Sequence, residues 1–340
     1  MHETPATDKR RLPRPARLIL RGVTALACTA LVVAACVNAS LSGAGDDART
    51  RLTLIAPAGA GGGWDGAARE AQQAMRAQGI VNNAQVVNIP GAGGTIGLNK
   101  FAGMQGESTS LMLMGITMLG AININGSETT LEDVTPIARI TDDYDVLVVP
   151  ADSPYDTVDE LVNDWQKDPN SFAFGGGSLG SVDQMIITQL AQQAGIDPTS
   201  VNYIAYSGGG ELATSLMSGT IKASVSGWVD FADQIEAGRL KALAVSAPEP
   251  VKSIDLPTLK ELGYDIELTN WRGIVAAPGI SEESKAQLQA IITEVVATDE
   301  WADAIERNQW TDTFLAGEEF EQFLDAERQA VDAIWSELGY

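Results

Sequence analysis

The sequence predicts an α/β fold in two domains, with mixed, mostly parallel sheets flanked by helices. Short apolar runs alternate with segments of helical period, which is the pattern of layered α/β proteins. The chain has 340 residues, about the length of two domains. Glycine-rich loops follow four of the apolar runs, two in each half of the chain, and each loop leads into a predicted helix. The unit of strand, glycine-rich loop and helix is therefore repeated in both halves of the chain.

The N-terminus has the pattern of an export signal, residues 1–35. Six Lys and Arg residues precede an apolar run, Gly22 to Ala35, which is shorter than the ~20 residues of a spanning helix. The run ends in Val-Ala-Ala-Cys36, which resembles a bacterial lipobox. The resemblance implies cleavage before Cys36, acylation of its sulfur and a lipid anchor on the outer face of the membrane or in the periplasm. Ordinary signal cleavage, with Cys36 incidental, is the alternative. Residues 36–50 are small and polar, and we interpret them as a flexible tether.

Removal of the predicted signal would leave a domain with few of the residue types that enzymes use for catalysis. His2 is the only histidine and Cys28 lies within the signal, so the exported domain has neither a histidine nor a free thiol once Cys36 is acylated. Composition therefore excludes Ser-His and Cys-His catalysis, histidine-ligated zinc and disulfides. The formal net charge of −23 disfavours nucleic acid as a partner. We expect a monomer that is not an enzyme and that uses no cofactor and no metal.

The first half contains two of the glycine loops. Its predicted strands are Leu52 to Ala56, Val86 to Ile89 and Leu111 to Gly115. The loop from Pro57 to Asp65 leads into a helix that ends at Gly79, and the loop from Pro90 to Gly97 leads into a short helix near Leu98 to Met104. Each loop thus joins the end of a strand to the start of a helix.

The second half repeats this arrangement. Predicted strands are Tyr144 to Pro150, Phe172 to Phe174, Val201 to Tyr206, Lys222 to Ser226, Leu240 to Ser246 and Trp271 to Ala277. Glycine loops at Gly175 to Ser181 and Ser207 to Glu211 follow two of them. Thr157 with Glu160, and Ser181 with Gln184, have the spacing of capping boxes. Ser281 caps a further helix, a short helix lies around Trp301 to Ile305, and the last helix carries Phe320 and Trp335 as core positions.

Counted from the first glycine of each loop, the two loops of the first half do not fit the dinucleotide-binding pattern. A Gly-x-Gly-x-x-Gly fingerprint that begins at Gly59 has Trp64 in its sixth place, and one that begins at Gly91 has Ile96 there. Neither loop ends in the Gly-Lys of a phosphate-binding loop. A loop of this kind exposes backbone N–H groups at the positive end of a helix, where small anions bind. Small-anion binding and simple tight turns therefore remain, and four such loops at strand-to-helix junctions favour binding.

These loops resemble the solute receptors of tripartite tricarboxylate transporters, also called Bug receptors. The matching stretches are PAGAGGGWDGAAR, NIPGAGGTIGLNKFA, GGGSLGSVDQM, YSGGGELATSLMSG, GRLKALAVS, LPTLKELGYD and NWRGIVAAPGIS. The resemblance implies a class II periplasmic-binding-protein fold that closes like a flytrap on a carboxylate, and delivery to an integral-membrane permease. It also implies a first domain of residues 50–149 plus 272–340 and a second of 150–271, with crossings near Val149-Pro150 and Trp271. Asp183-Gln184 departs from a histidine-containing pair common in the family, and YSGGGE lacks the basic residue that often follows the tyrosine.

The resemblance and the loops together define the candidate ligand-binding residues. These are Gly61, Gly62, Gly63, Trp64, Asp65, Gly93, Gly94, Thr95, Thr117, Ser178, Ser181, Ser207, Gly208, Gly209, Trp228, Asp230 and Arg272. Trp64 either walls the pocket or belongs to the core, and Asp65 either contacts the ligand or serves as an N-cap. Arg272 either pairs with a ligand carboxylate or forms a salt bridge at the hinge.

Two other functional classes fit parts of the sequence. A sensor subunit that presents the same solutes to a membrane kinase is the alternative to transport, and sequence does not separate the two. An enzyme that works through paired carboxylates is disfavoured because no such pair recurs in the glycine loops.

Metabolic labelling with a lipid precursor tests the anchor. We expect the wild-type protein to take up the label and Cys36→Ser to take up none, because acylation needs the sulfur. A Cys36→Ser protein that is still labelled would contradict the lipobox interpretation.

Overall fold

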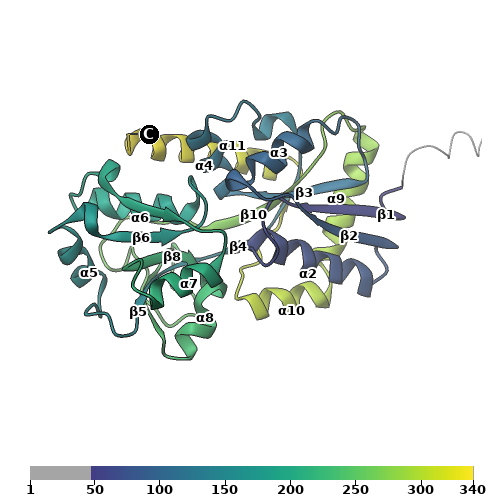
Figure 1. Ribbon diagram of the computed structural model, residues 1–340. Helices are drawn as coiled ribbons and strands as arrows, with labels where there is room; N and C mark the ends of the chain where they lie inside the picture. The colour runs from purple at the N-terminus through teal and green to yellow at the C-terminus, as the bar shows by residue number, and fades with distance from the viewer. Residues whose placement is uncertain (1–46, 340) are drawn as a thin grey trace, which may run out of the picture. The chain divides into compact units, whose positions relative to one another are not determined.

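A computed structural model describes residues 47–339 (Figure 1). The predicted signal, Cys36 and most of the predicted tether lie outside the described residues. Residues 47–50, expected in the tether, instead belong to the folded body, since Ala48 is fully buried and Arg49 pairs with Glu294 at 2.6 Å. Within residues 47–339, no helix is both long enough and apolar enough to cross a membrane.

The first sheet has six strands in the order β11-β4-β10-β3-β1-β2. Its strands are β1 (Arg51–Ala56), β2 (Asn83–Asn88), β3 (Ser110–Gly115), β4 (Thr135–Asp143), β10 (Asn270–Ala276) and β11 (Leu315–Ala316). β1 pairs in parallel with β2 and β3, whereas β10 runs antiparallel between β3 and β4. Because β1, β2 and β3 run in parallel, the loops that follow them lie at one edge of the sheet.

The second sheet has five strands in the order β7-β6-β8-β5-β9. Its strands are β5 (Asp145–Pro150), β6 (Ala173–Gly176), β7 (Asn202–Ala205), β8 (Ala223–Gly227) and β9 (Leu240–Val245). β6 is parallel to β7 and β8, while β5 is antiparallel to β8 and β9. Four of the nine pairings among the described strands are parallel, so the sheets are mixed, as predicted, but not mostly parallel. The difference arises at β5 and β10, which run against their neighbours.

Helices flank both sheets. They are α2 (Gly63–Ala77), α3 (Thr95–Ala102), α4 (Ile116–Asn125), α5 (Val158–Trp165), α6 (Val182–Gln193), α7 (Gly209–Met217), α8 (Trp228–Glu236), α9 (Glu282–Val296), α10 (Asp299–Asn308) and α11 (Glu318–Glu337). In Figure 1, α2 and α10 lie on one side of the first sheet and α3 and α11 on the other. The capping box at Thr157 and Glu160 is formed. The second predicted box is half formed, because Gln184 accepts from the N–H of Gly180 rather than that of Ser181.

The sequence patterns missed β4, α4 and α8. β4 begins Thr-Pro and ends in two aspartates, which hides a strand signal, although its centre is buried. α4 combines isoleucines, asparagines and a glycine, so its helix propensity is weak. It forms because tertiary contacts bury one side of it against α11 and β3.

The chain changes sheet twice. It leaves β4 at Asp143 and enters β5 at Asp145, and it returns after β9 along β10. β5 pairs only with strands of the second sheet, so a division by sheet would fall at Tyr144, earlier than the predicted crossing near Val149 and Pro150. The domain limits themselves stay a prediction.

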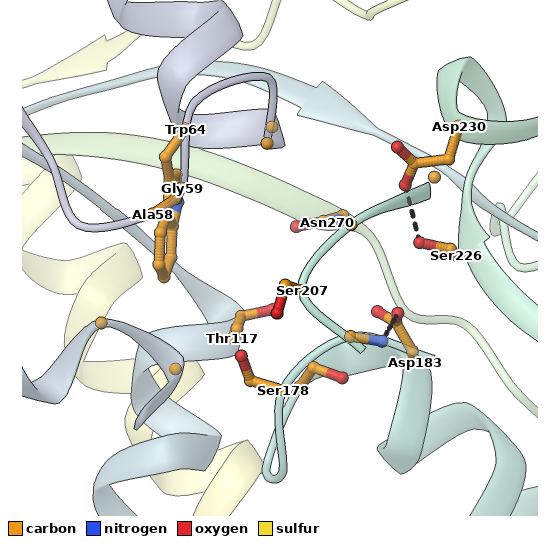
Figure 2. A pocket seen from close by; sticks show the side chains of 18 of the residues that line it. Ala58, Gly59, Trp64, Thr117, Ser178, Asp183, Ser207, Ser226, Asp230 and Asn270 are labelled. Atoms are coloured by element: carbon orange, nitrogen blue, oxygen red, sulfur yellow. Dashed lines mark hydrogen bonds between the residues drawn. The ribbon is translucent and has the colours of Figure 1, made fainter. Parts of the chain in front are cut away.

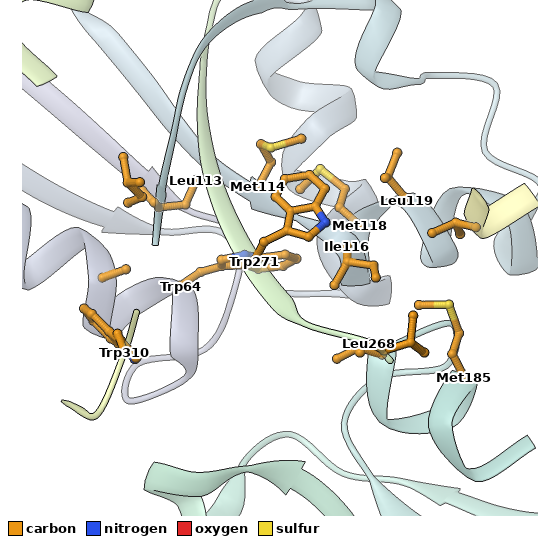
Figure 3. Packing of buried hydrophobic residues seen from close by; sticks show 14 of the residues in the cluster. Trp64, Leu113, Met114, Ile116, Met118, Leu119, Met185, Leu268, Trp271 and Trp310 are labelled. Carbon is orange, nitrogen blue, oxygen red and sulfur yellow. The ribbon is translucent and has the colours of Figure 1, made fainter. Parts of the chain in front are cut away.

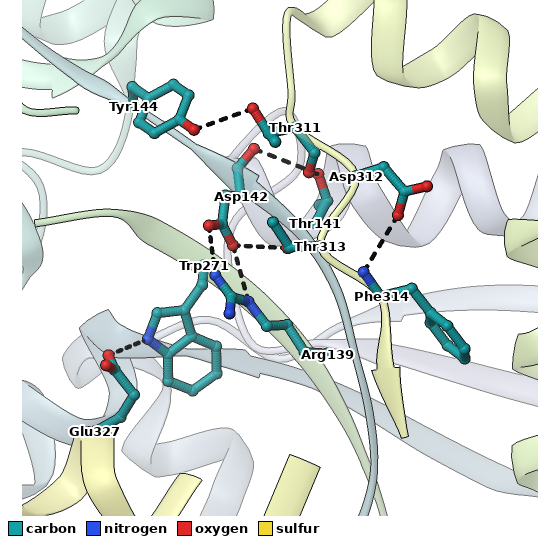
Figure 4. A network of polar contacts seen from close by, with 10 residues as sticks. All are labelled: Arg139, Thr141, Asp142, Tyr144, Trp271, Thr311, Asp312, Thr313, Phe314 and Glu327. Atoms are coloured by element: carbon teal, nitrogen blue, oxygen red, sulfur yellow. Dashed lines mark hydrogen bonds and ion pairs between the residues drawn. The ribbon is translucent and has the colours of Figure 1, made fainter. Parts of the chain in front are cut away.

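A polar network holds the first crossing in place (Figure 4). Asp142 forms an ion pair with Arg139 and accepts a hydrogen bond from Thr313 at 2.9 Å. The Tyr144 and Thr311 hydroxyls lie 3.0 Å apart. On the neighbouring strand, Trp271 is fully buried and its indole N–H donates to Glu327 at 2.6 Å. The ion pair and these hydrogen bonds satisfy the buried polar groups of both strands, and they hold the chain in place where it passes from one sheet to the other.

The main core continues up to the crossing strand (Figure 3). Trp64, Met118 and Trp271 pack there beside β3, and Met185 of α6 belongs to the same cluster. A separate, smaller cluster fills the second sheet's other side, around Phe231 and Leu240. The main cluster places an apolar floor beneath the loops that follow β1 and β2.

Candidate functional site

A pocket of about 790 Å³ lies where the loops of the two sheets meet (Figure 2). Its walls come from the loops after β1, β2, β6, β7 and β8, and from the crossing strands β4 and β10. Figure 2 shows Ala58, Gly59 and Trp64 on one side and Asp183, Ser226 and Asp230 on the other. The four predicted glycine loops thus converge on a single cavity.

Most helices that begin at the pocket start with a glycine. The N-cap residues of α2, α3, α7 and α8 are Gly62, Gly94, Gly208 and Gly227; all four line the pocket and none supplies a side-chain cap. α6 is the exception, with Ser181 as its cap. Away from the pocket, α5, α9 and α10 carry Thr or Ser caps, although α11 starts at an uncapped glycine. First-turn N–H groups without a cap are available to an anion.

The close approach of two loops also requires glycine. A Cβ on Gly120 of α4 would lie 2.0 Å from the carbonyl oxygen of Gly180, which precedes α6. The N–H of Val182 donates to the Thr117 hydroxyl at 3.4 Å. These contacts bring the start of α4 against the start of α6 at the edge of the pocket.

The pocket gathers most of the predicted ligand-binding residues. Those that line it are Gly61, Gly62, Gly63, Trp64, Gly93, Gly94, Thr117, Ser178, Ser181, Ser207, Gly208, Asp230 and Arg272. Trp64 is 9% exposed, so it both walls the pocket and belongs to the core. Their direct contact with a ligand stays a prediction.

Asp65, Thr95, Gly209 and Trp228 do not line the pocket. Asp65 is buried and holds the loop in shape, accepting from the N–H of Gly61 and the side chains of Arg69 and Asn88, each at 2.8 Å. Burial opposes its ionisation, but these hydrogen bonds lower the pKa of Asp65. It is the third residue of α2, so it is not the N-cap either.

The other three residues make contacts within the protein. Thr95 donates its hydroxyl to the carbonyl oxygen of Ala92. A Cβ on Gly209 would lie 2.5 Å from the Cβ of Asp230, so glycine allows that carboxylate to approach α7. Trp228 is half-buried and packs against the second core cluster.

The sequence patterns missed several lining residues. They include Pro57, Ala58, Gly59, Asn125, Asp143, Asp183, Tyr206, Ser226, Asn270, Asn308 and Trp310. Asp183 was visible only as a departure from the family pattern. Asp143 is the last residue of a strand that the patterns did not predict, so nothing marked it.

Arg272 is the only Lys or Arg residue among those lining the pocket. It is 4% exposed, and its Nη2 donates to Asp143 Oδ2 at 2.7 Å. In the β10–β4 register Arg272 lies opposite Thr141 and Asn270 opposite Asp143, so the ion pair is a diagonal contact within the reach of a long side chain. Nη1 is buried and has no hydrogen-bond partner among the described residues. The guanidinium therefore makes the salt bridge and keeps one donor unused.

Carboxylates gather behind and beside this ion pair. Burial, followed by the charges of Asp183 and Asp143, raises the pKa of Asp145 well above its ordinary value. Burial also raises the pKa of Asp183, although the N–H of Gly177 donates to it at 2.6 Å. Asp145 Oδ2 is buried and has no hydrogen-bond donor among the described residues, and because Asp183 contributes to the raised pKa of Asp145, we expect the two carboxyls to share a proton.

Asp230 completes this group. Its side chain is open to solvent through the pocket, yet protein surrounds it, and this burial together with Asp183 and Asp143 raises its pKa to about 6. Its Oδ2 accepts from the Ser226 hydroxyl at 2.7 Å. Among residues 47–339, no group of three or more Asp, Glu, His or Cys side chains is placed to hold a metal ion.

Two α/β sheets with a cavity lined by loops from both have the architecture of periplasmic binding proteins. The model of the protein family described as "Tripartite tricarboxylate transporter family receptor" matches residues 67–340. The chain therefore belongs to the tripartite tricarboxylate transporter receptor family.

Known relatives agree with this assignment. An Agrobacterium vitis protein from the TAR-I ttuE-ttuC' intergenic region is 27% identical over 251 residues, covering 73% of this chain and 70% of its own length. The periplasmic binding protein BugD has the same fold, with a TM-score of 0.77, 22% identity and coverage of 85% of this chain and 98% of its own.

Two Rhodopseudomonas palustris structures share the fold and contain a carboxylate. MatC holds bound malate; it is 20% identical with a TM-score of 0.70. Rpa4515 is described with adipate; it is 18% identical with a TM-score of 0.78. Each covers 85% of this chain and 97% of its own.

The carboxyl pair behind the pocket predicts a pH-dependent stability. A raised folded-state pKa contributes stability that is present below the unfolded value and is lost as the pH rises through the folded value. Asp145 and Asp183 should therefore make the protein less stable at pH 8 than at pH 5.5, and Asp230 and Glu327 act in the same direction. Asp145→Asn keeps a donor to Asp183 without a charge, so we expect about 1–3 kcal/mol more stability at pH 8 and a smaller pH dependence. Urea unfolding at both pH values measures this, and an unchanged pH dependence in the variant would contradict the shared proton.

Proposed function

We propose that the protein captures a small carboxylate, of the di- or tricarboxylate kind, and delivers it to an integral-membrane permease of the tripartite tricarboxylate type. One observation carries the proposal: the helices that begin at the pocket present glycine N-caps without capping side chains. Each hydrogen bond from such an N–H to a carboxylate is worth about 1.5–3 kcal/mol. A site of this kind binds an anion without a lysine or an additional arginine.

The carboxylate subsite is proposed at the starts of α2 and α3, beside Arg272. A Cβ on Gly63 would lie 2.7 Å from Arg272 Nη2, so the guanidinium sits against the first residue of α2. The unused Nη1 of Arg272 and the first-turn N–H groups of α2 can then donate to the same ligand group. Trp64 supplies an apolar wall next to this subsite.

The family and the bound ligands of its structural neighbours support a carboxylate, since MatC holds malate and Rpa4515 is described with adipate. In the proposed cycle, the two lobes close on the solute outside the cytoplasm. Residues 50–149 with 272–340 form one lobe, and 150–271 form the other. A lipid on Cys36 keeps the receptor near its permease.

Calorimetry over succinate, malate, adipate and citrate, together with amino-substituted counterparts of the first three, tests the proposal. We expect at least one to bind, with a change in tryptophan fluorescence, because Trp64 and Trp310 line the pocket. Absence of binding across the whole panel would remove the carboxylate assignment.

Gly62→Asp is expected to abolish binding without unfolding the protein. Gly62 has φ −77° and ψ 165°, which an aspartate N-cap adopts readily, and its own carboxylate would accept the N–H groups proposed for the ligand. Losing two such charged hydrogen bonds should weaken binding by about 100-fold or more. A Cβ at Gly62 would lie 3.3 Å from the carbonyl oxygen of Gly59, so a small shift of the loop opposes the gain from the new cap, and stability should change by about 1 kcal/mol or less.

Gly62→Ala is the matched control, since it adds the same Cβ without a charge. We expect it to retain most of the affinity. If Gly62→Asp bound as tightly as Gly62→Ala, the start of α2 would not be the carboxylate subsite.

A further inference from the structure

We propose that the loop before α6, residues 177–181, is a joint that sets the position of one lobe against the other by docking on α4. The two lobes are also connected by the chain itself, where it passes from β4 to β5 and from β9 to β10. The joint adds a contact between segments that are far apart in the sequence. Its effect on solute affinity rests on the proposed function, whereas the contact itself needs no solute.

Asp183 and Gln184 fix the shape of this loop. The N–H of Gly177 donates to Asp183 Oδ2 at 2.6 Å, a bond drawn in Figure 2, and the N–H of Gly180 donates to the Gln184 side chain at 2.8 Å. The Tyr203 hydroxyl donates to the carbonyl oxygen of Gly177 at 2.9 Å. N–H groups at a helix start are otherwise available to an anion. The pair that departs from the family pattern therefore uses these groups to hold the loop.

The loop contacts α4 through its backbone. A Cβ on Gly120 would lie 2.0 Å from the carbonyl oxygen of Gly180, and a Cβ on Gly180 would lie 2.7 Å from the Cα of Ala121. Gly180 also has φ +83°, a conformation that favours glycine. The N–H of Val182 adds a hydrogen bond to the Thr117 hydroxyl. Two glycines thus allow the close backbone approach in which Cα–H groups face a carbonyl oxygen.

Neighbouring elements enclose α4 on its other sides. A Cβ on Gly115, the N-cap of α4, would lie 2.3 Å from the carbonyl oxygen of Trp271 on the crossing strand β10. The Cβ position on Gly120 that meets the loop also lies 3.1 Å from Nε1 of Trp335 in α11. Because α4 is packed against β10 and α11, a side chain added at Gly120 would displace the loop before α6, and the second sheet with it.

The joint lies at the edge of the pocket, since Thr117 of α4 and Ser178 of the loop both line the cavity. A shift of about 1 Å or more is needed to bring a Cβ on Gly120 to contact distance from the Gly180 oxygen. The second sheet would turn about the crossing strands, so the gap between the two sets of loops would widen with distance from the joint. A solute held by one set would then lose contacts with the other.

Gly120→Ala tests the joint, and Gly210→Ala is the matched control. Both glycines lie in helices, α4 and α7, where alanine has the higher helix propensity. A Cβ on Gly210 would meet nothing within 4 Å, and Gly210 does not line the pocket. The two variants therefore differ in whether the added methyl group meets the joint.

Amide hydrogen exchange on the full-length protein without solute measures the contact directly. In Gly120→Ala we expect exchange about ten-fold faster or more over residues 116–125 and 177–185, because the separated backbones open more readily. Gly210→Ala should exchange like the wild type in both segments. Unchanged exchange in Gly120→Ala would overturn the joint, whether or not a solute binds.

Solute binding and scattering test the effect on lobe position. Calorimetry with the tightest-binding carboxylate of the panel should show affinity about ten-fold weaker or more in Gly120→Ala, the loss of one charged hydrogen bond. Small-angle X-ray scattering of this complex should give a larger radius of gyration than the wild-type complex. Gly210→Ala should match the wild type in both measurements. Unchanged affinity or an unchanged radius in Gly120→Ala would reduce the contact to local packing and overturn its role between the lobes.

Failure of the proposed function gives a different result. If the wild type binds no compound of the panel, the carboxylate receptor is wrong, and the exchange experiment still decides the joint. If Gly120→Ala does not fold, Thr117→Val replaces it in the exchange experiment, since valine keeps nearly the same shape and removes the acceptor of the Val182 N–H. The same two segments should then exchange about three-fold faster, and exchange equal to the wild type would overturn the joint.

Discussion

The pocket depends on helix starts that are left without capping side chains. A helix N-terminus that is buried without a partner is unfavourable, and proteins normally satisfy it with Ser, Thr, Asn or Asp. This chain does so at Thr157, Ser281 and Thr298, away from the pocket. At Gly62, Gly94 and Gly208, by contrast, the protein leaves donors to be satisfied by solvent or by a solute. The sheet topology contributes to the same arrangement, because parallel neighbouring strands place those helix starts at one edge of each sheet.

The second constraint is the charge distribution. An acidic chain that binds an anion must keep its own carboxylates away from the donor wall. Asp65 is the instructive case, since it lies in the first glycine loop yet turns inward to Gly61, Arg69 and Asn88. Asp143, Asp183 and Asp230 line the other side of the pocket, where the Arg272–Asp143 ion pair offsets part of their repulsion. Removing either partner of such a buried ion pair typically costs about 3–5 kcal/mol, because the other charge is left buried and unpaired.

The crossing strands connect the binding site to the core. β10 carries Arg272 on the pocket side and Trp271 on the core side, as alternation along a strand requires. Trp271 packs at right angles to Phe323 of α11, with 5.1 Å between ring centroids. The indole N–H is satisfied by Glu327 of the same helix. A ligand group that binds Arg272 therefore contacts a strand whose other side is fixed by the C-terminal helix.

The sequence alone determined the alternation of strands and helices, the four glycine loops and the family resemblance. These properties are local, because they depend on composition, period and spacing within a few residues. Only the tertiary structure decided which side chains meet in the pocket. Asp143 and Asp183 are 40 residues apart and Arg272 lies on a third segment, so no local pattern indicates their proximity. β4 and α4 escaped prediction for the same physical reason, since long-range packing rather than intrinsic propensity stabilises them.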